Sequence, residues 1–109
     1  MPTEEIEPDD VRFGTERELT RVVDRLNSMA LNRAEGATSD VVTCAERLVT
    51  AGRALGVPIP ADAVLPALAP QGFGSMIAVL AGDCMAAAGS DDDLRPVLDA
   101  LTALRRALP

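Results

Sequence analysis

The sequence predicts an all-α protein, a small antiparallel helical bundle of four long helices plus one short helix in the Pro/Gly-rich connection. Apolar residues recur every three or four positions in four separate segments. No segment alternates apolar and polar residues over the length of a strand, and the connections are short enough to join antiparallel neighbours. A length of 109 residues, 48% of them hydrophobic, is typical of one folded domain with a modest core.

The first long helix is predicted to begin after Thr15 and to end before Gly36. Thr15 is followed three residues later by Glu18, which is a capping-box pattern. Its apolar positions are Leu19, Val22, Val23, Leu26, Met29 and Ala30. Residues 1–12 are acidic, contain two prolines and show no hydrophobic period. We therefore expect a mobile acidic N-terminal tail over 1–12 and a single helical-bundle domain over 13–109.

The second long helix is predicted over residues 41–55. Ser39 or Asp40 would cap its N-terminus, and Gly56 would end it. Its inward positions, which recur with a helical period, are Val41, Cys44, Ala45, Leu48, Val49, Gly52 and Leu55.

A short helix is predicted at about 63–69, within the connection that follows. Asp62 would be its N-cap, and Pro66 would lie in its first turn, where the missing N–H of proline costs little.

The third long helix follows Ser75 and ends at Gly89, and it is apolar on nearly all sides. Such a helix is normally central or lies at a subunit contact. The last helix is strongly amphipathic, with Asp92 or Asp93 as its cap and Pro96 in the first turn. Its apolar stripe is Leu94, Val97, Leu98, Leu101, Leu104 and Leu108.

The composition excludes most catalytic chemistry, because the chain has no His, Lys, Tyr or Trp. Without His there is no Ser-His or Cys-His nucleophile pair and no His-bearing metal site. Without Lys there is neither a Schiff base nor a P-loop lysine. We therefore expect no catalytic residues, metal ligands or cofactor. An enzyme would be restricted to carboxylate or thiol chemistry around Asp83 and Cys84.

The charge also limits the partners. All 10 basic residues are Arg, against 17 acidic residues, so the formal net charge is −7 and the field around the protein repels phosphate backbones and anionic lipids. The chain begins with acids where a signal peptide needs basic residues and an apolar run. Its longest apolar stretch is interrupted by Asp83 and is short of the roughly 20 residues that a membrane span needs. The expectation is a cytoplasmic protein that binds neither nucleic acid nor membrane.

Two surface features are candidates for interaction. Arg17, Arg21 and Arg25 recur every four residues on the side of the first helix that faces away from its apolar stripe. This Arg ridge offers bidentate contacts to an acidic partner, and a solvated face paired with neighbouring acids is the simpler interpretation. Asp83 is the only charged residue in the third helix, and it must pair with an Arg, be protonated or reach solvent. Its plausible partners are Arg47, Arg53 and Arg33.

The two cysteines, Cys44 and Cys84, are too few for a disulfide framework or a zinc site, and each lies on an apolar helix face. We expect both thiols to pack in the core as small hydrophobes. A redox-sensitive pair is the alternative if their helices are neighbours.

One segment, residues 36–60, loosely resembles the part of acyl carrier proteins that bears the phosphopantetheine-modified serine. The shared features are Gly36-Ala37-Thr38-Ser39 at the start of a helix and Gly56-Val57-Pro58-Ile59-Pro60 at its end. In that family Asp precedes the serine and Leu or Met follows it, whereas Thr38 and Asp40 flank Ser39 here. The resemblance covers about a quarter of the chain, and it would make Ser39 a modification site.

These observations favour a small protein–protein interaction module, either a homodimer or the acidic partner of a larger protein. The contact would use the third or fourth long helix, with the Arg ridge adding polar specificity. The alternative is a ligand-carrying or redox-sensing bundle that uses Ser39 or the Cys44/Cys84 pair.

Overall fold

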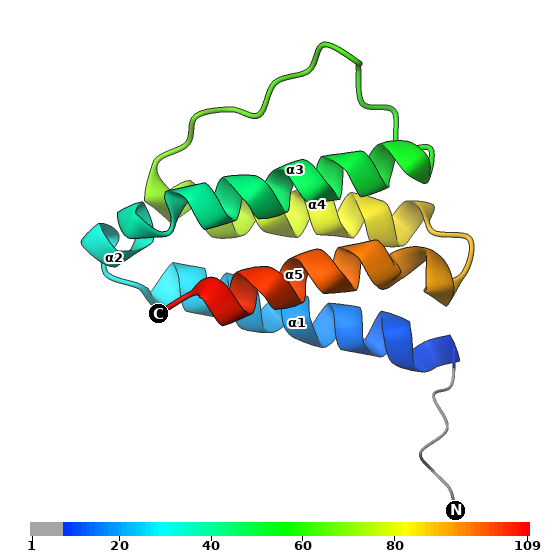
Figure 1. Cartoon of the computed structure of the whole chain (residues 1–109), viewed down its shortest axis with the longest axis horizontal. Coiled ribbons are helices and arrows are strands. Elements are labelled where there is room, and N and C mark those ends of the chain that lie inside the picture. Colours follow the sequence, from blue (N-terminus) through cyan, green and yellow to red (C-terminus); the bar gives the residue numbers. More distant parts are fainter. Residues whose placement is uncertain (1–7) are drawn as a thin grey trace, which may run out of the picture.

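The structure, a computed structural model, describes residues 8–109, and within them it contains helices and no strand (Figure 1). The α-helices are α1 (Pro8–Ser28), α2 (Leu31–Gly36), α3 (Thr38–Ala54), α4 (Phe73–Ala87) and α5 (Arg95–Ala107). Two 3₁₀ turns, η1 (Pro70–Gly72) and η2 (Asp91–Leu94), lead into α4 and α5. The predicted all-α bundle of four long helices is confirmed.

The four long helices pack around one core. α1 lies against α4 and α5, and α3 lies against the same two helices, so α1 and α3 are diagonally opposite. The core is aliphatic, with Phe73 as its buried aromatic residue. Its largest fully buried apolar side chains are Leu48, Ile77, Leu94, Leu101, Val22, Val41 and Val97. The amphipathic stripe of α5 thus faces the core: Val97, Leu101 and Leu104 are buried, and Leu98 and Leu108 are partly buried against it.

The direction of one helix differs from a simple up-and-down order. α3 and α4 run the same way, and the connection between them returns along the length of the bundle before α4 begins (Figure 1). The contact of η1 with α2 agrees with this, because both lie at the end where α3 starts. α1 and α5 are likewise parallel to each other, and both oppose α3 and α4.

The predicted short helix at 63–69 is wrong, because those residues form no helix. Proline disfavours helical backbone in the residue before it. Pro66 and Pro70 therefore restrict Leu65 and Ala69, and Ala69 has φ −67° and ψ 153°. The short α-helix of this chain is instead α2, between the first two long helices.

Residues 57–69 form what we call the arch. Fully extended, 13 residues reach about 45 Å, whereas the 17 residues of α3 rise about 25 Å. The arch is longer than its return path requires, and it bows away from the bundle (Figure 1).

The helix ends differ in detail from the predicted ones. α1 begins at Pro8, because proline suits a first helical turn and because Val11 is buried and extends the apolar stripe. The predicted tail thus includes a helical part, and its residues 1–7 lie outside the described residues. Ser39 and Asp40 lie inside the first turn of α3, which has no side-chain cap. Ser90, rather than Asp92 or Asp93, caps the turn before α5, in a capping box with Asp93.

Candidate functional site

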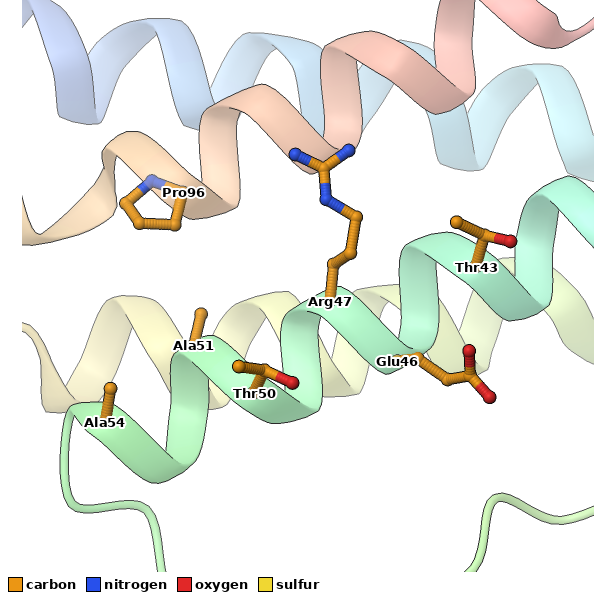
Figure 2. Close-up of a pocket in the computed structure, with 7 residues that line it drawn as sticks. All are labelled: Thr43, Glu46, Arg47, Thr50, Ala51, Ala54 and Pro96. Carbon is orange, nitrogen blue, oxygen red and sulfur yellow. The ribbon is translucent and has the colours of Figure 1, made fainter.

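A shallow groove of about 420 Å³ lies between α3 and α5 (Figure 2). Its lining is Thr43, Glu46, Arg47, Thr50, Ala51, Ala54 and Pro96. A smaller hollow of about 60 Å³ continues it past Arg47 toward Asp40, Ala103 and Ala107. The groove exists because both helices present small side chains where they meet, so their surfaces do not fill the space between them.

Arg47 is the only basic residue in the lining of the groove. Its side chain leaves α3 and extends toward α5, whereas Glu46 points away from α5 (Figure 2). Arg47 forms no ion pair with a carboxylate of the residues that the structure describes. The groove therefore holds a guanidinium that is free to bind an anion or a carboxylate.

The arch is the second unusual surface. Val64 is 87% exposed and Leu68 is 40% exposed, while Leu65 packs partly against the core. Over residues 64–69 no backbone N–H donates to a described backbone carbonyl. Asp62 is the only charged residue of the arch, and it forms no ion pair within the described part of the chain. A segment with a single charge and no helical hydrogen bonds over residues 64–69 resembles the peptides that partner proteins bind.

The arch is fixed where it leaves α3. Arg53 Nη2 donates a 2.7 Å hydrogen bond to the Pro60 carbonyl oxygen. Gly52 has no side chain to occupy the space where Val57, Ile59 and Cys84 converge, each about 3.4 to 3.5 Å from the position of an added Cβ. The arch thus departs on the α4 side of α3, opposite the groove.

The Arg ridge is exposed, and its three residues contact groups of their own chain. The guanidinium carbon of Arg17 lies 5.8 Å from the centre of the Phe13 ring. Arg21 forms a 3.6 Å ion pair with Glu18. Arg25 donates to the carbonyl oxygen of Pro109. These contacts agree with the solvated, partly paired face that is the simpler interpretation of the ridge.

Asp83 and Cys84 are neighbours in α4 that face different surroundings. Asp83 is exposed, and no described Arg forms an ion pair with it. Cys84 is buried, and its Sγ lies 3.4 Å from the Leu48 carbonyl oxygen. The two side chains therefore do not form a common site.

Both thiols are free and buried. Burial raises the pKa of Cys44 to about 12, although the nearby Arg47 opposes the shift. Burial and, secondarily, Asp83 raise the pKa of Cys84. Because the thiolate is the reactive form, neither environment favours nucleophilic or redox chemistry. Ser39 is exposed in the first turn of α3, and its modification stays a prediction.

Among residues 8–109 no group of three or more His, Cys, Asp or Glu side chains is placed to hold a metal ion. Of the helices described, none has the length and apolar character needed to cross a membrane. Comparisons with known protein families, with curated proteins and with solved structures give no significant match.

Sequence reasoning missed the groove and the arch. It noted Arg47 only as a possible partner of Asp83, and it placed residues 63–69 in a helix. One feature of the sequence could have predicted a non-helical connection there. Residues 57–69 contain three prolines and a single charged residue.

Proposed function

We propose that this protein is a protein–protein interaction module that associates with a second copy of itself. The observation that carries the proposal is the exposure of Val64 and Leu68 in an arch with a single charged residue. Connecting segments on a protein surface are usually polar, and exposed apolar segments mark contacts with other molecules. Burial of these side chains against another protein removes their apolar surface from water.

The outer side of α4 supports the same proposal. Val79 is 61% exposed there, and Asp83 is the only charged residue of the helix. Of the two helices expected to make the contact, α5 turns its apolar stripe toward the core, where Leu98 and Leu108 are partly buried, whereas α4 has the largely exposed Val79.

The net charge of −7 favours a contact through these sparsely charged surfaces. Two copies repel each other over most of their acidic surface, and the repulsion is weakest where few charges meet. The Arg ridge is not needed for this contact, because its residues already engage groups of the same chain.

Light scattering coupled to size exclusion tests the proposal on the reduced protein across a dilution series. We expect the mass to rise with concentration from 11.4 kDa toward twice that value. Val64→Asp is expected to shift the protein toward the monomer. Leu31→Asp adds the same charge at another exposed apolar residue, outside the arch, and serves as the control. A mass of one chain at every concentration of the unmodified protein overturns the proposal.

A further inference from the structure

We propose that the arch of each copy lies in the α3–α5 groove of the other, with Asp62 paired to Arg47 across the interface. This inference rests on the proposed self-association and names its contact surface. The occupant of the groove is a second copy of this chain, as the charges, shapes and positions of the arch and the groove indicate.

One charge of the groove is complementary to the charge of the arch. The arch carries the exposed carboxylate of Asp62, and the lining of the groove carries Arg47 together with Glu46. Neither Asp62 nor Arg47 forms an ion pair within the described chain. Arg47 extends toward α5, whereas Glu46 points away from α5 (Figure 2). An Arg–carboxylate contact at this point is a charge-assisted hydrogen bond that fixes the register of the two copies.

The shapes also fit. The walls beside Arg47 carry methyl groups and a proline ring, from Thr43, Thr50, Ala51, Ala54 and Pro96. These small side chains leave room for an extended chain, and their apolar carbons suit the uncharged neighbours of Asp62, above all Val64. Residues 64–69 also have backbone N–H groups that donate to no backbone carbonyl among residues 8–109 and that can donate to hydroxyl or carbonyl oxygens of the partner.

The arch and the groove flank α3 on opposite sides. The arch leaves α3 beside α4, as the position of Gly52 shows, and the groove lies beside α5. In a two-fold dimer, an arch that enters the groove of the other copy makes this contact twice. Asp62 lies in the turn closed by the hydrogen bond from the Ala63 N–H to the Pro60 carbonyl oxygen, and Arg53, which holds Pro60, lies six residues after Arg47 in α3.

A charge exchange tests the contact. Asp62→Arg and Arg47→Asp each place like charges together, and each is expected to raise the dimer dissociation constant at least tenfold. The double variant Asp62→Arg/Arg47→Asp restores the pair with reversed sign. We expect it to recover most of the lost affinity, measured by light scattering or by sedimentation at several concentrations.

Matched controls separate this contact from a general charge effect. Asp24→Arg changes the net charge as much as Asp62→Arg, at an exposed position on α1, and Arg33→Asp matches Arg47→Asp on α2. Both controls are expected to dimerise like the unmodified protein. Circular dichroism verifies that each variant is folded, which we expect because the substituted side chains are exposed.

The outcomes distinguish the two proposals. If the unmodified protein is a monomer throughout, the proposed function and this contact both fail. If it dimerises but the single variants dimerise equally well, or if the double variant is no better than the single ones, the contact is overturned while self-association stands.

Discussion

Arg105 of α5 and Glu18 of α1 form an ion pair across the seam between the two parallel helices, with 2.5 Å between Nε and Oε1. The Glu18 side chain is only 10% exposed, and Arg21 lies on its other side at 3.6 Å. Glu18 is thus held between two guanidinium groups, one from its own helix and one from the last helix of the chain. The pair fixes the register of α1 against α5.

Replacement of Arg105 by Met is expected to destabilise the protein by about 1–3 kcal/mol, because it leaves a largely buried carboxylate with one distant partner. Arg106→Met removes the neighbouring exposed guanidinium and is expected to cost less than about 0.5 kcal/mol. Urea unfolding of both variants measures the two free energies. Equal losses would show that the pair contributes no more than an ordinary surface charge.

The sequence predicted the long helices well because each carries a strong local signal. In α5 the spacing of Val97, Leu101 and Leu104 identifies the buried face, and all three are fully or almost fully buried. Gly56 was expected to end α3, and it takes a positive φ one position after the C-cap Leu55. These features depend on residues a few positions apart.

The arch and the candidate site depend on relations that local patterns do not contain. Pro66 is compatible with the first turn of a helix and also with a non-helical chain. The non-helical form is adopted because this segment must span the distance between the end of α3 and the start of α4. Glu18 and Arg105 are 87 residues apart. Arg47 lines a groove because Pro96 and Ala103 of α5, which lie far from it in the sequence, are opposite α3 in the structure. Helix order in space sets each of these contacts.

Alkaline pH is expected to destabilise the protein through its two cysteines. The chain has no Lys, Tyr or His, so Cys44 and Cys84 are the only side chains that titrate between about pH 8 and 11. Burial raises the pKa of both thiols, so the folded state keeps protons that the unfolded state releases. The contribution of the protonated thiols to the free energy of unfolding is fully present below the ordinary thiol pKa near 8.5. It is lost as the pH rises toward the raised pKa values of the folded state. The expected loss at pH 10 is roughly 1 to 2 kcal/mol from Cys44, and the raised pKa of Cys84 adds to it in the same direction.

Urea unfolding at pH 7.5 and pH 10 checks this assignment. Cys44→Ala is expected to reduce the difference between the two conditions, and Cys44→Ala/Cys84→Ala to abolish it. A double variant that loses as much stability at pH 10 as the unmodified protein would refute the assignment to the cysteines.

The buried thiols are also expected to be unreactive in the folded protein. A disulfide reagent such as dithionitrobenzoate should label Cys44 and Cys84 only slowly in buffer and both at once in urea, because labelling requires an exposed thiolate. The absorbance of the released thiolate reports the rate. Rapid labelling of the folded protein, with a disulfide between Cys44 and Cys84 under mild oxidation, would instead support the redox-sensing alternative.

Gly56 is expected to stabilise the turn from α3 into the arch, because it adopts a backbone conformation that other residues rarely take. Its φ is +94°, a conformation that L side chains rarely adopt, although an added Cβ would meet no atom within 4 Å. Gly56→Ala should therefore cost about 1 kcal/mol through backbone strain alone.

Gly82→Ala is the matched control, because Gly82 lies inside α4 with equally open space and ordinary helical φ. That substitution is expected to stabilise the protein by about 0.5–1 kcal/mol, since alanine favours helix. Thermal unfolding of the two variants should move the midpoint in opposite directions, and an unchanged midpoint for Gly56→Ala would show that the turn does not need the left-handed conformation.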